Sequence, residues 1–171
     1  MTRRIHRLSM TFAAALFSLV AASSALAQSE ERGATLELFG SRIQQIEGPK
    51  FHNESYGLRG GFRFSETWAL EASVSRLDED VDVWFGDLSA KAYVVDTSHF
   101  DLYALGGPGV NRISDGDFDE DETTVHFGIG AEIHLGQQAY LRPEVRGRWL
   151  TDDLEFDRGL ADYSLGIGWR F

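Results

Sequence analysis

The chain has 171 residues and a formal net charge of −11, because 27 acidic residues outnumber 16 basic ones. This excess of acid argues against nucleic acid as a partner, since phosphates attract basic surfaces. The chain contains no cysteine, which excludes a disulfide framework and a lipid-modified cysteine anchor.

Residues 1–27 have the organisation of a cleavable signal peptide. Three arginines among the first seven residues form a basic start, residues 8–22 are mostly apolar or small, and Ala25-Leu26-Ala27 offers a cleavage site. A membrane anchor would need a longer apolar stretch. The mature chain would then be residues 28–171, with 13 basic and 27 acidic residues and a net charge of −14. It contains no apolar run that could form a transmembrane helix.

The mature chain alternates apolar and polar residues at period two, which indicates strands with two different faces. The first four predicted strands span 33–42, 56–64, 68–77 and 84–95. In each of them one parity is apolar and the other is polar or charged. The apolar parity carries Leu36, Leu38, Tyr56, Leu58, Phe62, Trp68, Leu70, Val74, Leu88 and Val94, and the other parity carries Glu37, Arg59, Arg63, Glu71, Asp87 and Lys91.

The next predicted strands span 100–112, 123–135 and 139–150, and an eighth ends at Phe171. The segment Gly106-Gly107-Pro108-Gly109 can bend or bulge its strand, and a bulge is expected at Pro143 because proline cannot donate to the ladder. The apolar parity carries Phe100, Leu102, Phe127, Ile129, Ile133, Leu141, Val145, Trp149, Tyr163, Leu165, Ile167 and Trp169, and the opposite parity carries Asp101, His126, Glu132, His134, Arg142, Glu144, Arg146, Arg148, Asp162 and Arg170.

Connections between these strands alternate in length. Residues 65–67, 95–99 and 136–138 form short turns, whereas 43–55, 78–83, 113–122 and 151–160 are longer and polar. An even-stranded membrane barrel has short turns on the periplasmic side and longer loops outside. We therefore predict an all-β protein, an eight-stranded antiparallel up-and-down transmembrane β-barrel over residues 28–171, with the last strand paired to the first.

Turn length also predicts strand register. If Leu135 pairs with Ala139, then Glu132 faces Arg142 and Gly130 faces Glu144. Pairs of opposite charge would fill an interior that has room only for side chains, so we expect a plugged lumen and no broad channel. The predicted lumen network comprises Glu37, Arg59, Arg63, Glu71, Asp87, Lys91, Glu132, Arg142, Glu144, Arg146 and Arg170. Glu71 would lie diagonally between Arg59 and Arg63.

The C-terminus carries a more specific pattern: Ser164, Gly166, Trp169 and Phe171 place a polar residue, a glycine and two alternating aromatics at the end of the chain. With this ending, the chain resembles the small eight-stranded outer-membrane barrels of Gram-negative bacteria, the OmpA- and OmpX-like group. The resemblance implies insertion into the cell outer membrane by the barrel-assembly machinery, with outer-membrane lipid and lipopolysaccharide as partners. For such a barrel we predict a structural or surface-interaction role such as membrane integrity, adhesion or loop-mediated binding.

Acidic residues gather in the predicted outer loops, most densely in 113–122. Asp115, Asp117, Asp119 and Asp121 are candidates for binding a divalent cation, but their spacing lacks the glycine and closing glutamate of an EF-hand loop. Solvated loops are the simpler interpretation. An extracellular partner could bind these loops. We predict no cofactor and no dedicated metal centre.

Aromatic residues near the predicted strand ends fit the interfacial belts of a membrane barrel. They are Phe39, Phe62, Phe64, Trp68, Phe100, Trp149, Trp169 and Phe171.

Three other functions fit the pattern less well. A narrow porin-like channel shares the same fold. A lipid A-modifying barrel enzyme would resemble the lipid A deacylases, which have a serine two residues after a histidine, but Gly128 occupies that place after His126. No nucleophile, base and orienting group are evident in the sequence, so no catalysis is expected. A secreted lipocalin-like binder would need every strand inverted, with its charges outside.

Overall fold

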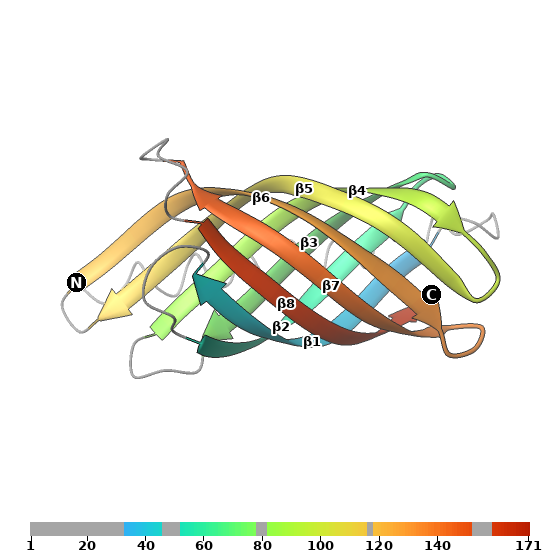
Figure 1. Ribbon diagram of the computed structural model, residues 1–171, viewed down its shortest axis with the longest axis horizontal. Helices are drawn as coiled ribbons and strands as arrows, with labels where there is room; N and C mark the ends of the chain where they lie inside the picture. The colour runs from blue at the N-terminus through green and yellow to red at the C-terminus, as the bar shows by residue number, and fades with distance from the viewer. Residues whose placement is uncertain (1–32, 46–51, 78–81, 116–117, 152–158) are drawn as a thin grey trace.

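The computed structural model describes residues 33–45, 52–77, 82–115, 118–151 and 159–171. These residues form eight antiparallel strands that close into one barrel in chain order (Figure 1). No helix in this part of the chain is long and apolar enough to cross a membrane. The predicted fold class is confirmed. The strands are β1 (Gly33–Gln45), β2 (His52–Arg63), β3 (Trp68–Leu77), β4 (Asp82–Asp96), β5 (Phe100–Asp115), β6 (Phe118–His134), β7 (Ala139–Leu150) and β8 (Gly159–Arg170).

Closure of the barrel joins β8 to β1, as predicted. Leu36 is opposite Trp169, and the pairing continues to Gln45 opposite Leu160. The Phe171 amide donates to the carbonyl of Ala34 at 2.9 Å. The backbone of the last residue thus belongs to the seam, and neither edge of the sheet is left unpaired.

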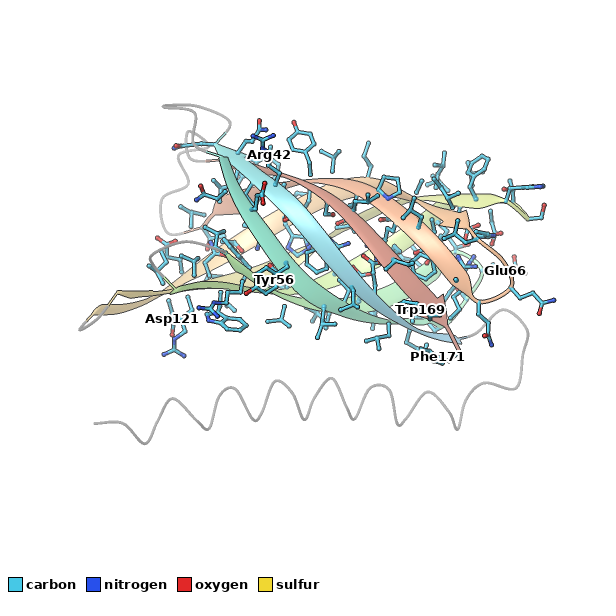
Figure 2. The ribbon with its side chains drawn as sticks, turned by 90° about the horizontal axis from the view of Figure 1, so that it is seen from below. Arg42, Tyr56, Glu66, Asp121, Trp169 and Phe171 are labelled. Carbon is cyan, nitrogen blue, oxygen red and sulfur yellow. The ribbon has the colours of Figure 1, made fainter. Side chains whose placement is uncertain are left out.

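The barrel has two distinct ends. We call the end with the short turns near Ser65, Ser98 and Gln137 the turn end, and the opposite end the loop end. Figure 2 places Glu66, Trp169 and Phe171 at the turn end and Arg42 and Asp121 at the loop end. In the last turn, the Leu135 amide donates to the Ala139 carbonyl at 2.9 Å, as the register prediction required.

Strands run farther toward the loop end than predicted. β1 extends to Gln45, β2 begins at His52, and β5 and β6 continue to Asp115 and Phe118, which pair with each other. The predicted loop over 113–122 is therefore mostly a β-hairpin, which reaches beyond the other strands in Figure 1. The sequence pattern did not predict these strand ends. A hairpin outside a membrane contacts water on both faces, so its residues do not alternate between apolar and polar.

Apart from Phe39, the apolar and charged side chains named for the two parities face the predicted directions in the described strands. Leu38, Ile129 and Leu165 are 54%, 67% and 55% exposed, whereas Glu37, Glu132 and Arg142 are fully buried. Exposed apolar groups on the outside and buried charges on the inside reverse the usual order of a soluble protein. This sidedness is that of a transmembrane barrel.

Aromatic side chains gather on the outer face near both ends. Phe64, Trp68, Phe100, Trp169 and Phe171 are exposed at the turn end, and Tyr56, Trp84 and Tyr163 are exposed toward the loop end. Phe39 departs from the predicted belt: it lies inside, 7% exposed, with the Arg59 guanidinium 3.8 Å from its ring centre. Phe39 follows Glu37 by two residues on β1, so the two side chains point to the same face of the strand.

Two predicted irregularities are wrong. The register of β4 with β5 is the same on both sides of Gly106–Gly109, and the bulge lies instead between Tyr93 and Val95. Pro143 keeps its register with β8, while pairing with β6 is interrupted near it without a shift. The missing proline N–H therefore interrupts one ladder locally and does not require an extra residue.

Candidate functional site

The interior of the barrel holds the largest concentration of chemistry-bearing side chains in the described structure. Seven acidic residues line it, all buried: Glu37, Glu71, Asp87, Asp101, Glu132, Glu144 and Asp162. Seven basic residues face them: Arg59, Lys91, Arg142, Arg146 and Arg148, which are buried, and Arg63 and Arg170, which are partly exposed. The interior is thus close to neutral in a chain whose net charge is −11.

Arg142 on β7 is the centre of this network. Its guanidinium donates to both carboxylate oxygens of Glu71 at 2.5 and 3.0 Å, to Glu37 at 3.2 Å and to Glu144 at 2.5 Å. The remaining Nε donates to the Tyr103 hydroxyl at 2.5 Å. One side chain therefore connects β1, β3, β5 and β7 through charge-assisted hydrogen bonds.

Arg59 on β2 extends the network toward the loop end. It donates to Glu37 at 2.6 Å, to Glu144 at 3.2 Å and to the Ser164 hydroxyl at 3.0 Å. The Phe39 ring under its guanidinium supplies a cation–π contact. Glu37 and Glu144 thus both bridge Arg59 and Arg142, which offsets the cost of burying a carboxylate.

Asp87 on β4 binds a second pair of arginines. Arg148 donates to its two oxygens at 2.5 and 2.9 Å, and Arg146 donates to one of them at 2.9 Å. Arg146 also donates to Glu144 at 2.9 Å. These contacts link Asp87 to the Arg142 centre through a continuous series of ion pairs.

The network reaches the turn end through Lys91 and Glu132. Lys91 donates to Glu132 at 2.7 Å and lies 3.2 Å from Glu71. Arg170 on β8 donates to Glu132 at 2.7 Å and to Asp101 at 2.8 Å. Arg63 closes this end with an ion pair to Asp96 at 2.6 Å and a longer approach to Asp101 at 3.8 Å.

All eleven predicted lumen residues are joined in this one series, but two predicted pairings differ. Glu132 contacts Lys91 and Arg170, whereas its predicted partner Arg142 contacts Glu71. Glu71 has the predicted register, opposite Gly61 and so diagonal to Arg59 and Arg63, yet it forms ion pairs with Lys91 on the adjacent strand β4 and with Arg142 across the lumen. The lumen is narrow enough for long side chains to reach strands that are not their neighbours. Asp101 and Arg148 belong to the series too, although the sequence predicted only that they face the interior.

The structure also brings together a serine, a histidine and an aspartate, which the sequence did not suggest. The Ser89 hydroxyl is 2.8 Å from His126 Nε2, and His126 Nδ1 is 3.6 Å from Asp87. Gly107 lies opposite His126 on the intervening strand β5. With no side chain at Gly107, the imidazole reaches across β5 to Ser89 on β4. The glycine segment thus leaves space between β4 and β6, and it does not shift the register of β5.

This trio lacks the features of a catalytic triad. Asp87 is 3.6 Å from the imidazole, beyond hydrogen-bond distance, and it is already bound by Arg146 and Arg148. Ser89 and His126 are 2% and 0% exposed, so no substrate reaches them in this conformation. The geometry is that of packing within the ion-pair network.

An apolar cluster lies inside the barrel toward the loop end. Ile43, Leu77 and Phe85 are buried together, with Val83 and Leu160 packed against them. The Arg148 guanidinium is 4.9 Å from the Phe85 ring centre, so this cluster borders the charged network. The interior therefore changes from charged to apolar toward the loop end.

The four cation candidates are on or beside the β5–β6 hairpin. Asp115 is the last residue of β5, Asp119 and Asp121 are on β6, and Asp117 lies outside the described residues. Asp121 is 3.6 Å from Arg112. In the part of the chain that the structure describes, no group of three or more acidic or histidine side chains is arranged to hold a metal ion.

The four residues of the C-terminal pattern divide between the two faces of β8. Ser164 and Gly166 point inward, while Trp169 and Phe171 are 40% and 68% exposed. A Cβ at Gly166 would collide with the Glu37 carboxylate. The glycine of the pattern therefore also has a packing role, because it leaves room for Glu37.

Comparison with solved structures supports this architecture. The N-terminal β-barrel domain of Pseudomonas aeruginosa OprF is 15% identical with a TM-score of 0.64, covering 80% of this chain and 97% of that one. Ail, the attachment invasion locus protein of Yersinia pestis, is 18% identical with a TM-score of 0.58, covering 82% and 97%. Neisserial surface protein A is 14% identical with a TM-score of 0.60, covering 84% and 98%. At these identities the likeness shows the fold alone.

Comparison with curated protein sequences gives no match. The model of one protein family does match, over residues 12–171, and its description is outer membrane protein beta-barrel domain. The match spans all eight strands and agrees with the outward apolar face and the charged interior. The chain belongs to the outer membrane protein beta-barrel family.

Proposed function

We propose that the protein is an integral outer-membrane barrel with a structural or surface-interaction role, exported by a signal peptide over residues 1–27. The sidedness of the wall carries this proposal: apolar groups such as Ile129 face outward, and ionised groups such as Arg142 are neutralised inside. Only a lipid surrounding makes both faces favourable at once. The turn end then faces the periplasm, and the β5–β6 hairpin projects outside.

Membrane fractionation with a gel assay tests this proposal. A folded barrel stays compact in detergent without heating and migrates differently after boiling. We expect the protein in the outer-membrane fraction with such a shift. Recovery in the soluble periplasmic fraction would contradict the proposal and favour a secreted binder.

We further propose that the lumen is closed. Arg142 links carboxylates from β1, β3 and β7, and these ion pairs cross the whole interior. The Ile43–Leu77–Phe85 cluster adds an apolar layer toward the loop end, which further hinders ions and water. A channel would need these contacts to open together, at a large cost in unpaired charge.

Conductance measurements in planar bilayers distinguish a closed barrel from a narrow channel. The purified protein should give no steady single-channel current, whereas a porin of larger strand number measured in parallel provides the positive control. Regular current steps that change size after Arg142→Gln would establish the channel alternative.

No catalysis is proposed for the interior. Ser89, His126 and Asp87 are buried beside Arg146 and Arg148, and the aspartate is too far from the imidazole. Ser89→Ala should therefore leave lipid A composition in the host envelope unchanged. A change in acyl chains that disappears with Ser89→Ala would contradict this proposal.

The surface role is proposed for the loop end, where the β5–β6 hairpin carries Asp115, Asp119 and Asp121. A neighbour of similar fold, Ail, has been crystallised with the heparin analogue sucrose octasulfate. The acidic β5–β6 hairpin of this chain does not favour a polyanion of that kind. A cationic or neutral extracellular partner fits the charge better.

Assembly is proposed to depend on the C-terminal residues. Phe171 is exposed on the outer face, while its backbone closes the seam with Ala34. Phe171→Asp should lower the amount of assembled barrel more than the amount synthesised, and Phe171→Tyr is the matched control. Equal assembly of both variants would argue against a signal read by the barrel-assembly machinery.

A further inference from the structure

The start of β6 has a partner strand on one side only among the residues that the structure describes. Residues 118–122 pair with β5. On the side of β7, the last bond runs from the Thr151 amide to the Thr123 carbonyl, at 3.1 Å. Beyond that bond, no described residue pairs with residues 118–121 on this side, which we call the open edge.

Strand alternation identifies the backbone groups that face the open edge. In antiparallel sheets, one residue bonds to the strand on one side and the next residue bonds to the strand on the other side. The Thr123 carbonyl faces β7, so the N–H and C=O groups of Asp121 and Asp119 point to the same side. Those of Glu120 point to β5, where Glu120 is opposite Ile113. The backbone groups of Asp119 and Asp121 are therefore placed to pair with an added strand.

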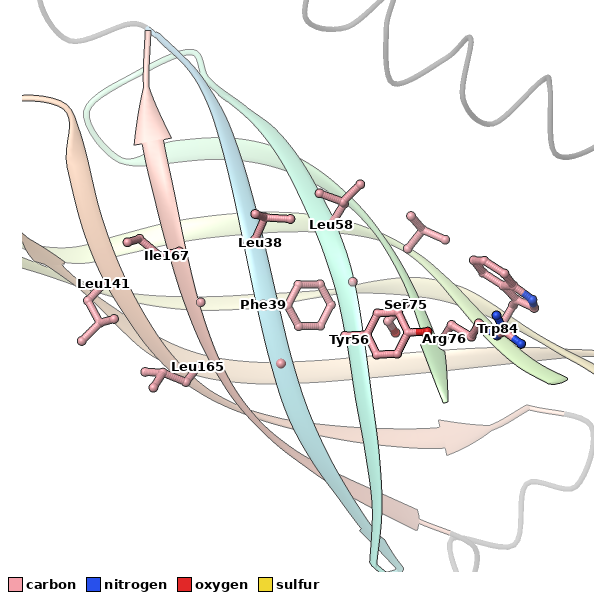
Figure 3. Close-up of a pocket in the computed structure, with 14 residues that line it drawn as sticks. Leu38, Phe39, Tyr56, Leu58, Ser75, Arg76, Trp84, Leu141, Leu165 and Ile167 are labelled. Atoms are coloured by element: carbon pink, nitrogen blue, oxygen red, sulfur yellow. The ribbon is translucent and has the colours of Figure 1, made fainter. Parts of the chain in front are cut away.

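The open edge lies where the apolar outer face of the barrel ends. Figure 3 shows Tyr56, Arg76 and Trp84 beside the apolar side chains that line a groove on that face. The row continues around the barrel, because Trp84 is opposite Arg112 on β5, and Arg112 is opposite Asp121 on β6. Aromatic rings and arginines are typical of the boundary of the hydrocarbon layer. The open edge begins at this boundary and continues into water, where an extended polypeptide can reach it.

The charge of the open edge selects its occupant. Residues 119–122 read Asp-Glu-Asp-Glu, so both parities of the strand are acidic. Continuing the β6–β7 register would set Asp121 opposite Asp153 and Asp119 opposite Glu155. Like charges directly opposite are destabilising, and a second copy paired edge to edge would also set acid against acid. A segment rich in lysine or arginine gains an attraction at the same positions.

We infer that the open edge binds an extended, basic segment of an extracellular polypeptide, which joins the sheet as a strand beside β6. The inference rests on the proposed outer-membrane location, because that location places the loop end outside the cell. Main-chain hydrogen bonds to Asp119 and Asp121 supply affinity, and the acidic side chains supply selectivity. The same acidic residues keep neutral and acidic strands from pairing there.

Fluorescence anisotropy with the folded barrel in zwitterionic detergent tests the inference. The probe is a short labelled peptide in which lysine and threonine alternate. One control peptide replaces lysine by glutamate, and the other keeps lysine but is methylated at its backbone nitrogens, so that it has the charge without the N–H donors. We expect the unmodified lysine peptide to bind about tenfold more tightly than either control.

Variants of Asp121 separate the backbone contribution from the charge. Asp121→Asn removes the charge and keeps the N–H, whereas Asp121→Pro also removes the N–H, which points away from β5 and is not needed for the hairpin. We expect Asp121→Asn to weaken binding of the lysine peptide about threefold, and Asp121→Pro to weaken it about tenfold more. Each variant is first checked for the compact form on the gel.

Three results would overturn the inference. Equal binding of the methylated and unmodified peptides would show that charge alone attracts the probe, and equal binding of the glutamate peptide would remove the selectivity. Slow hydrogen exchange at the Asp121 amide without peptide would show that the open edge is already paired within the chain. With the wild type in the compact form, each of these results leaves the proposed function intact. A wild type that never reaches that form would contradict the proposed function itself.

Discussion

Glu144 and Val145 are consecutive residues of β7 that meet opposite environments. Glu144 is buried and accepts hydrogen bonds from Arg59, Arg142 and Arg146. Val145 is 44% exposed on the outer face, beside Ile129. The wall therefore tolerates charge where partners converge and excludes it where none can be supplied. The two faces differ mainly in whether a charged side chain finds hydrogen-bonding partners of opposite charge, and less in how deeply it is buried.

Removing the central cation of the inner face should have the largest effect. Arg142→Met would leave Glu37, Glu71 and Glu144 without their shared donor. We expect a loss of about 3–5 kcal/mol in unfolding free energy, because a broken buried ion pair leaves uncompensated charge. Urea titration of the barrel in lipid vesicles, followed by the gel shift, measures this loss.

Arg142→Lys is the matched control for that experiment. It keeps the charge but cannot donate to both oxygens of Glu71 while also reaching Tyr103. Its stability should lie between those of the wild type and Arg142→Met. A methionine variant as stable as the wild type would show that the interior charges are solvated by water and not by one another.

Adding a cation to the outer face is the converse experiment. Ile129 is 67% exposed near the middle of the apolar positions of β6. Ile129→Arg should cost about 2–4 kcal/mol if this position is near the bilayer midplane. The same titration in vesicles measures the cost, with Ile129→Leu as the control. Full tolerance of arginine would contradict the lipid-facing assignment.

The sequence predicts which of these two faces a side chain occupies, but it does not predict which partner the side chain contacts. Period-two alternation was enough to predict the strand number and the sidedness, because each depends only on parity along one strand. Ion-pair partners such as Glu71 with Arg142 depend on reach across the lumen, which strand neighbours do not reveal. The Ser89–His126 contact depends on an empty Gly107 between them. Strand ends near Asp115 and Phe118 were missed because alternation fades outside the membrane.

Replacing a glycine by alanine should cost more stability on the inner face than on the outer face. A Cβ at Gly107 would collide with the Leu88 backbone carbonyl across the ladder, whereas one at Gly40 would make only an ordinary van der Waals contact with the Ser55 carbonyl oxygen. We expect Gly107→Ala to cost about 1–3 kcal/mol through overpacking, and Gly40→Ala to be neutral or slightly stabilising. Thermal unfolding by gel shift compares the pair. Equal stability of both variants would remove the proposed role of Gly107 in clearing the interior.

The smallest effect is expected where the inner face meets water at the turn end. Arg63 is 16% exposed and donates to Asp96 at 2.6 Å, but Asp96 is 55% exposed. Water can replace the lost partner there, so Arg63→Met should cost about 0–1 kcal/mol. Repeating the urea titration at high salt tests the reason: salt should weaken the wild type toward the variant, because exposed pairs are screened. A loss as large as that of Arg142→Met, insensitive to salt, would mean that the charged interior extends unhydrated to the mouth of the barrel.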